Sequence, residues 1–286
     1  MLMNMRDLLA VANKHFFAVP AFNISDYSML NGIIEASEEK QAPLIIAIHP
    51  DELRFTGVEI VAAIAAKANK TALPICVHLD HGGNFEQVQL AIQSGFTSVM
   101  IDGSHLPFDE NIAICKKVVE AAHAVDISVE GELGTIGSTD SQAEAGAEEI
   151  IYTRPEDAVK FVEATGIDTL AIAIGTSHGI YPKGMKPELK LDLLKEIKSK
   201  VSIPLVLHGG SNNRDSEISE SVKLGINKIN ISSDIKAAYF TKMREVLLDA
   251  SLREPNVVEP PCMDAMKTVA YNKIELFNAV GKASLY

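Results

Sequence analysis

The feature that most constrains the fold of this chain is a regular alternation of short apolar segments with longer segments of helical periodicity. The apolar segments are nearly continuous, as in PLIIAI, LAIAIG and PLVLHG, which is typical of parallel strands buried on both faces. Eight segments are predicted as strands, at residues 16–23, 42–48, 73–80, 98–103, 127–133, 169–175, 203–208 and 226–231. Because eight consecutive βα units close naturally into a barrel, the predicted fold is an α/β (β/α)8 TIM barrel.

The predicted helices lie between these strands, near residues 26–40, 57–70, 84–94, 109–124, 155–166, 188–199, 215–224 and 235–250. An open doubly wound sheet is the alternative, but it usually has a Gly-rich turn after its first strand, where this chain reads ISDYS. No linker divides the 286 residues. We expect one barrel domain over residues 1–286, with 251–286 as a C-terminal loop, extending to residue 261, and a last helix near 263–279.

The composition limits which binding partners and which cellular compartment are expected for this protein. The net charge of 26 − 38 = −12 disfavours non-specific binding to nucleic acids and to anionic membranes. Three widely spaced cysteines without a CxxC pair are typical of free thiols in a reducing compartment. No apolar run approaches the roughly 18 residues that cross a bilayer. We expect a cytoplasmic protein with no nucleic acid or membrane partner.

Two long polar segments interrupt the alternation, at residues 134–152 and 176–187. They follow the fifth and the sixth predicted strand. Loops of this length inside a compact domain are usually functional, and the active sites of barrels lie at the C-terminal ends of the strands. Both segments are therefore expected at the active site.

Three histidines follow three different predicted strands, namely His81, His178 and His208. Each alone is better explained as a packed structural histidine, but three at one end of a barrel form a common catalytic zinc set with an open fourth position. Glu132 and Asp102, also at strand ends, are candidates to complete the metal shell or to alternate in it.

Asp80 directly precedes His81 and is the candidate general acid/base. The alternative is that its carboxylate only orients a ligand histidine through a hydrogen bond. A phosphate site is indicated by two loops, Gly209–Gly210–Ser211 after strand seven and Asn230–Ile231–Ser232–Ser233 after strand eight, because the second opens a helix whose free N–H groups attract anions.

Eight sequence motifs are distributed over nearly the whole chain. They are VPAFN (19–23), HLDHG (78–82), SVMIDGSHLPFDENI (98–112), VEGELG (129–134), AIGTSHGIY (173–181), PLVLHGGS (204–211), KINISSD (228–234) and MDAMKTV (263–269). Taken together, these motifs resemble the class II, zinc-dependent ketose-bisphosphate aldolases, closest to the tagatose-bisphosphate and fructose-bisphosphate branch.

The resemblance implies a Zn²⁺ ion on His81, His178 and His208, and proton exchange between Asp80 and the C4 hydroxyl of the substrate. Glu132 and Asp102 correspond to carboxylates at alternate metal positions, and a monovalent cation is a further candidate cofactor. A homodimer or homotetramer is expected on the same ground. Contacts with the sugar phosphate are implied for Asn23, Gly179, Gly209, Gly210, Ser211, Asn230, Ile231, Ser232 and Ser233.

Two positions depart from the family pattern. Asp140 lies where relatives carry a Glu that abstracts the proton from dihydroxyacetone phosphate, and its side chain is one methylene shorter; Glu144 is the weaker substitute. His49 lies where relatives usually carry Ser or Thr near the sugar, and its bulk makes a different aldehyde partner plausible.

The resulting hypothesis is reversible cleavage of a ketose 1,6-bisphosphate, of tagatose or fructose type, into dihydroxyacetone phosphate and glyceraldehyde 3-phosphate. The first alternative is an aldolase for another ketose 1-phosphate with an unphosphorylated aldehyde product, which His49 motivates. The second is a catalytically weak sugar-phosphate-binding regulatory or accessory subunit, which the altered loop motivates.

Overall fold

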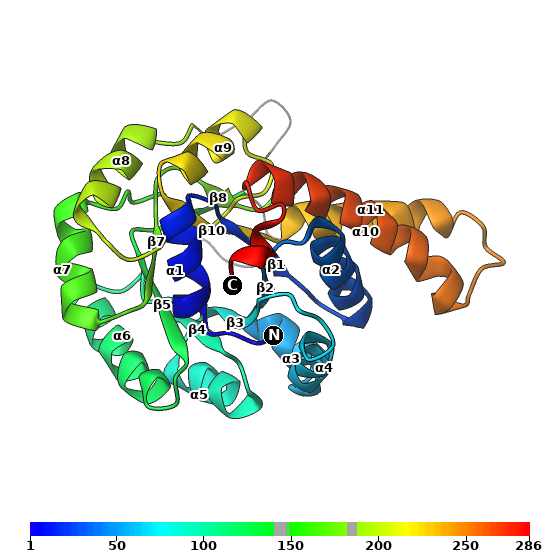
Figure 1. The fold of residues 1–286 in the computed structure, drawn as a ribbon, viewed down its shortest axis with the longest axis horizontal. Coiled ribbons are helices and arrows are strands. Elements are labelled where there is room, and N and C mark those ends of the chain that lie inside the picture. Colours follow the sequence, from blue (N-terminus) through cyan, green and yellow to red (C-terminus); the bar gives the residue numbers. More distant parts are fainter. Residues whose placement is uncertain (140–146, 148, 182–187) are drawn as a thin grey trace.

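A computed structural model describes residues 1–139, 147, 149–181 and 188–286 (Figure 1). Asp140 and Glu144, the two candidate bases of the first long loop, lie outside the described residues.

Eight parallel strands close into a barrel in the order β1, β10, β9, β7, β5, β4, β3, β2, so the predicted (β/α)8 fold is confirmed (Figure 1). Nearly every residue of these strands is buried, as expected for strands covered by helices outside and by packed side chains inside. The strands are β1 (Val19–Asn23), β2 (Leu44–Ile48), β3 (Ile75–Gly82), β4 (Ser98–Ile101), β5 (Ser128–Leu133), β7 (Thr169–Ile172), β9 (Leu205–Leu207) and β10 (Ile226–Ile231).

Each barrel strand is followed by a helix of the outer ring. Helix α6 illustrates the pattern, since its buried residues Asn111, Cys115, Val118 and Ala122 recur at helical spacing and form one inward face. These helices are α2 (Tyr27–Lys40), α4 (Glu59–Ala68), α5 (Phe85–Ser94), α6 (Phe108–His123), α7 (Pro155–Thr165), α8 (Leu191–Lys200), α9 (Asp215–Lys223) and α10 (Ser233–Val246).

Two helices were not predicted from the sequence, α1 (Met5–His15) and α3 (Pro50–Thr56). Helix α1 did carry a signal, because the side chain of Asn4 caps its first turn and apolar residues follow at helical spacing. Helix α3 has seven residues and starts with Pro50, directly after β2. A helix of seven residues is too short to show a hydrophobic periodicity in the sequence.

The predicted loop over residues 251–261 is too long: residues 251–254 are non-helical as expected, but helix α11 (Pro255–Leu276) begins at Pro255 rather than near residue 263. Pro260 and Pro261 lie inside this helix, although each lacks an N–H group for helical hydrogen bonding. Helix α11 packs against both α10 and α2, and Val258 and Cys262 beside the prolines are buried. This packing offsets the loss of the two helical hydrogen bonds that the prolines cannot make.

The chain ends with the 3-10 helix η1 (Lys282–Leu285).

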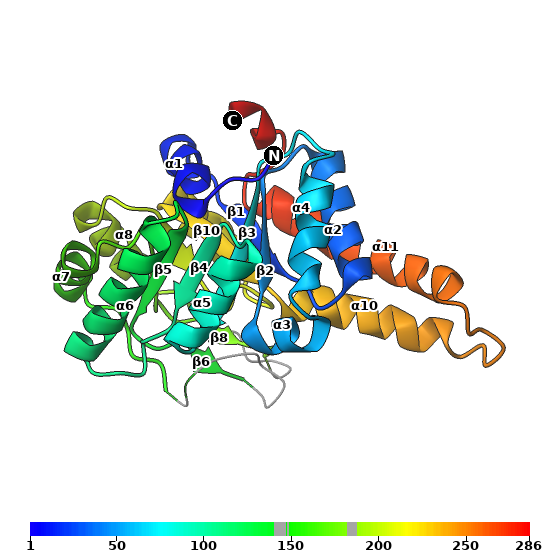
Figure 2. The ribbon, with the colours of Figure 1, turned by 90° about the horizontal axis from the view of Figure 1, so that it is seen from below.

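Helices α10 and α11 project together beyond the barrel as one arm, residues 233–276 (Figures 1 and 2). Phe240, Leu247, Leu248 and Val257 of this arm are exposed, Leu248 by 85 %. Exposed apolar side chains gathered on one projection are typical of a surface that meets another protein chain.

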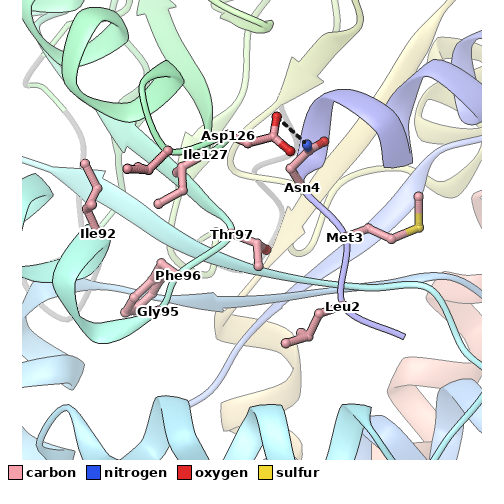
Figure 3. Close-up of a pocket in the computed structure, with 10 residues that line it drawn as sticks. Leu2, Met3, Asn4, Ile92, Gly95, Phe96, Thr97, Asp126 and Ile127 are labelled. Atoms are coloured by element: carbon pink, nitrogen blue, oxygen red, sulfur yellow. Dashed lines mark hydrogen bonds between the residues drawn. The ribbon is translucent and has the colours of Figure 1, made fainter.

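The two ends of the barrel have different character. Helix α1 and both termini lie at one end, whereas the short strands β6 (Gly137–Ser138) and β8 (Ser177–His178) lie at the other (Figure 2). At the α1 end, a groove of about 430 Å³ is lined by ten residues that include Leu2, Ile92 and Phe96 (Figure 3). In this groove Asn4 Nδ2 donates to Asp126 Oδ1 at 3.4 Å.

No helix in the described part of the chain has both the length and the apolar character of a membrane span.

Candidate active site

Three histidine rings meet at the β6/β8 end of the barrel. His81 lies on β3, His178 on β8 and His208 directly after β9, and one ring nitrogen from each lies within 4.8 Å of the others. Nε2 of His81, Nε2 of His178 and Nδ1 of His208 are buried without a hydrogen-bond partner in the described structure. Because buried polar atoms are normally paired, three such nitrogens in one place are the arrangement expected of ligands to a bound cation.

His81 reaches this cluster through a local distortion of β3. His78 and Asp80 point into the barrel by strand alternation, so the next residue should point outward. His81 instead has a left-handed backbone with φ +50°, and the register between β3 and β4 shifts between Leu79 and Gly82. At Gly82 a Cβ would lie 2.5 Å from the carbonyl oxygen of Met100, so glycine permits the close strand contact there. Asp80 and His81 therefore both face the site.

Two of the three rings are oriented by carboxylates. Nδ1 of His81 donates to Asp102 Oδ2 at 2.9 Å, and Nε2 of His208 donates to Glu130 Oε1 at 2.7 Å. Ser104 in turn holds the other oxygen of Asp102 through its backbone N–H and its hydroxyl, at 3.1 and 2.7 Å. With the outward nitrogen donating, the opposite nitrogen keeps its lone pair, which is the state a metal ligand needs. The donor set therefore fits Zn²⁺.

A second group of metal-type ligands overlaps the first. His81, Asp102 and Glu132 also offer ligand atoms within 4.8 Å of one another, and Glu132 Oε2 is buried without a hydrogen-bond partner among the described residues. Burial raises the pKa of Glu132 well above its ordinary value, and the charge of Asp102 adds to the shift. A hollow of about 220 Å³ beside this group is lined by residues that include Ser104, Ile136 and His178.

The carboxylate of Asp80 is 3 % exposed and adjoins the histidine cluster, with Oδ1 4.0 Å from Nδ1 of His208. Asn23 Nδ2 donates to Oδ2 at 2.7 Å and Asn230 Nδ2 donates to Oδ1 at 2.9 Å. Burial alone would raise the pKa of Asp80, but positive charge at the neighbouring His81 and His208 positions outweighs it and holds that pKa well below its ordinary value. The two amide donors stabilise the carboxylate form of Asp80, which is the form that can accept a proton.

Several residues that were predicted to contact the substrate also make hydrogen bonds or close contacts within the protein. Asn23 and Asn230 hold Asp80 through their amides. The N–H of Gly210 donates to the carbonyl oxygen of Asn230 at 3.2 Å, so this donor is already used. Gly209 has φ +65°, and a Cβ there would lie 2.7 Å from the carbonyl oxygen of Ser177, which places the backbone before His178 against the loop after β9.

The remaining predicted phosphate contacts lie around the start of α10. Ser211 Oγ accepts from the N–H of Asp234 at 3.3 Å, which brings the loop after β9 to this helix terminus. Ser232 is the N-cap but makes no side-chain capping bond, and Ser233 opens the helix. Ile231 has a fully buried side chain, so only its backbone is available to a ligand. Gly179, with φ +98°, directly follows His178.

His49 lies at the end of β2 and stabilises the start of the next helix. Its Nδ1 accepts from the N–H of Asp51 at 3.2 Å, which caps the N-terminus of α3, and the residue is 8 % exposed. In the neutral ring the proton therefore sits on Nε2.

A polar group lies deeper in the barrel than the histidine cluster, and its hydrogen bonds to Lys228 and His208 were not predicted from the sequence. His78, Glu130 and Lys228 have fully buried side chains inside the barrel, and Lys228 Nζ donates to both oxygens of Glu130, at 3.0 and 2.8 Å. The sequence did contain an indication of this group, because Glu130 lies two residues before Glu132 and Lys228 lies two residues before Asn230. Residues two apart on a strand point to the same face, so Glu130 and Lys228 each share the inward face of a predicted site residue.

Comparison with known proteins agrees with this geometry. The sequence model described as fructose-bisphosphate aldolase class-II matches residues 3–282. The solved structure of the YdjI aldolase from Escherichia coli K12 is 34 % identical, with 99 % of this chain and 100 % of that chain covered and a TM-score of 0.87. A putative fructose-1,6-biphosphate aldolase from Coccidioides immitis is 28 % identical, with 99 % of both chains covered and a TM-score of 0.89.

A third solved structure, the fructose-bisphosphate aldolase of Campylobacter jejuni, is 21 % identical over 98 % of this chain and 96 % of that chain, and its TM-score of 0.82 shows the shared fold. The family match over nearly the whole chain confirms the resemblance and the aldolase class of enzyme. The chain belongs to the class-II fructose-bisphosphate aldolase family.

Proposed function

We propose that this aldolase is zinc-dependent and that it reversibly cleaves a ketose 1,6-bisphosphate, of tagatose or fructose type, into dihydroxyacetone phosphate and glyceraldehyde 3-phosphate. The observation that carries the proposal is the meeting, among the described residues, of three buried imidazole nitrogens without hydrogen-bond partners beside the carboxylate of Asp80. His81, His178 and His208 would hold the metal, and Asp102 and Glu132 offer an alternate position. When bound, Zn²⁺ supplies Lewis-acid stabilisation of the charge that develops on the ketose oxygens.

In the cleavage direction, Asp80 accepts the proton of the C4 hydroxyl while the C3–C4 bond breaks and C4 becomes the aldehyde carbon. The electron pair of the broken bond stays on C3, and a proton must then be delivered there. Asn23 and Asn230 orient the two oxygens of Asp80 and stabilise its charged form. We assign the delivery of the second proton to Asp140, on the sequence argument alone.

The 1-phosphate would bind where the loops after β9 and β10 meet at the start of α10. Support comes from the Ser211–Asp234 contact and from the first N–H groups of α10, which helix geometry leaves without intrahelical partners. Gly179, Gly209, Ser232 and Ser233 would line this site, and His49 would lie toward the aldehyde half.

We also propose a homodimer or homotetramer and a cytoplasmic location. The exposed apolar side chains of the α10–α11 arm support self-association. The three cysteines are free and buried, which supports a reducing compartment. Sedimentation of the purified protein over a range of concentrations tests the first point, and a monomer at all concentrations would contradict it.

The test of the activity is a substrate panel with the zinc-loaded protein, in which cleavage is followed by the release of dihydroxyacetone phosphate. Tagatose 1,6-bisphosphate and fructose 1,6-bisphosphate are compared with ketose 1-phosphates whose far end carries no phosphate. Highest kcat/KM for a bisphosphate supports the proposal. Preference for a monophosphate would transfer the assignment to an aldolase with an unphosphorylated product, and no turnover of any member would favour a binding subunit.

A further inference from the structure

Beneath the histidine cluster, the barrel interior contains a buried ion pair that no catalytic step uses. Glu130 on β5 and Lys228 on β10 have fully buried side chains, and their strands are separated in the barrel by β7 and β9. The pair therefore bridges the interior of the barrel. His78 Nε2 lies 3.7 Å from Glu130 Oε2, and the other nitrogen of His78 shares a hydrogen bond with Ser98 Oγ at 2.9 Å.

Such a pair is costly, because both ions lose their hydration, and buried pairs are weak evidence of a gain in stability. Its geometry suggests a different use. Glu130 Oε1 accepts from Lys228 Nζ at 3.0 Å and from His208 Nε2 at 2.7 Å, while Oε2 accepts from Lys228 at 2.8 Å. Lys228 thus holds both oxygens of the carboxylate that orients His208.

We propose that Lys228 is a positioning residue for the metal centre: it holds Glu130 so that Nε2–H of His208 donates to it and Nδ1 of His208 faces the metal position. This inference rests on the proposed zinc site. Nδ1 of His208 has no hydrogen-bond partner among the described residues, and it lies 4.0 Å from Asp80 Oδ1, where it faces the histidine cluster. Lys228 also supplies the positive charge that lets Glu130 be an ionised acceptor in the barrel interior.

The first measurement is Zn²⁺ affinity, by competition with a chromophoric chelator, together with the visible absorption spectrum of the Co²⁺-loaded protein. Lys228→Met keeps the length of the side chain and removes its charge. We expect it to weaken Zn²⁺ binding by about tenfold to a hundredfold, the usual effect of losing a group that orients a metal ligand, and to alter the Co²⁺ spectrum. Lys267→Met is the matched control, because Lys267 pairs with Glu35 and Glu39 between α11 and α2, away from the cluster.

A second comparison keeps the test decisive if Lys228→Met fails to fold. In Glu130→Gln/Lys228→Met the amide oxygen can still accept from His208, whereas Glu130→Leu/Lys228→Met has no acceptor, and neither variant buries an unpaired charge. The Gln variant should bind Zn²⁺ about tenfold more tightly than the Leu variant. Equal affinity of the two double variants, or wild-type affinity and spectrum in Lys228→Met, would overturn the role of Lys228. If the wild-type protein binds neither Zn²⁺ nor Co²⁺, the zinc proposal itself fails, and this inference fails with it.

Discussion

The two sides of the histidine cluster are held in different ways. On the barrel side, the rings of His81 and His208 each donate to a carboxylate, Asp102 and Glu130. On the loop side, no carboxylate among the described residues accepts from the ring of His178. That residue is held through its backbone, since its carbonyl oxygen accepts from Thr139 N at 2.9 Å and from Thr139 Oγ1 at 2.8 Å.

This difference follows from the elements that carry the proposed metal ligands. Barrel strands are fixed by ladders on both sides, so their side chains can be oriented by neighbours across the barrel. Strand β8 has two residues and, within the described part of the chain, pairs only with β6, from the other long loop. Ser177, its first residue, is fixed locally by the hydroxyl of Tyr181, which accepts from Ser177 N at 2.6 Å. We therefore expect large effects from changes on the barrel side and small ones from changes at the loop contact.

The largest effect is expected for loss of a barrel-side ligand. His208→Ala should bind little or no zinc and lose cleavage activity, because an open three-His site with one ligand removed holds the metal poorly. Chelation of the wild-type protein should have the same effect, and added Zn²⁺ or Co²⁺ should restore it. Zinc content by atomic absorption checks the variant, with His15→Ala on α1 as control. Full activity in metal-free protein would contradict the prediction.

Next in size is Asp80, which lies on the barrel side but is not a proposed ligand. Asp80→Ala should retain zinc while cleavage falls by about a hundredfold or more, the usual scale for a positioned acid/base group. Zinc content and kcat are measured on the same preparation. If the variant loses zinc and recovers activity in excess metal, Asp80 acts by orienting a ligand rather than by accepting the proton.

The second candidate base is Asp140, which is predicted from the sequence alone. Asp140→Ala should slow exchange of the hydroxymethyl proton of dihydroxyacetone phosphate with solvent by about a hundredfold, with zinc and phosphate binding nearly unchanged. Asp140→Glu should preserve exchange or raise it. NMR in deuterated water measures the rate, and undiminished exchange in Asp140→Ala would move the role to Glu144 or to water.

A smaller effect is expected where the ligand stays and only its orienting partner changes. Asp102→Asn should weaken Zn²⁺ binding by about tenfold, because an amide holds Nδ1–H of His81 less strongly than a carboxylate does. Asp168→Asn is the matched control, since Asp168 holds His123 in a similar pair on α6. Equal losses of Zn²⁺ affinity in both variants would show a general effect on the fold instead.

The smallest effect is expected at the loop contact. Thr139→Val removes one of the two hydrogen bonds to the carbonyl oxygen of His178 and leaves the backbone bond in place. A single neutral hydrogen bond contributes about 1 kcal/mol, so Zn²⁺ affinity should fall by less than about fivefold. A loss as large as that of Asp102→Asn would show that both sides are held equally firmly and would break the comparison.

Most of the site could be located from the sequence because barrel topology places strand ends together. Asp80, His81 and His208 were predicted at one end of the barrel, and the structure brings them into contact distance. The helix at Pro255 was missed because the local cost of Pro260 and Pro261 argued for a loop, whereas packing against α2 and α10 outweighs that cost. The hydrogen bonds from Asn23 and Asn230 to Asp80 were not predicted, because Asp80 is distant from both residues in the sequence.

The sequence by itself determined the barrel and the set of side chains at its active end, because strand number, strand length and inward alternation are local properties. Only the tertiary structure decided how those side chains are used. The left-handed turn at His81 depends on the close contact of Gly82 with β4. The nitrogen that His208 offers depends on Glu130 and Lys228, which come from two other strands. Hydrogen-bond direction in a buried site is set by neighbours across the barrel, and no spacing along the chain encodes it.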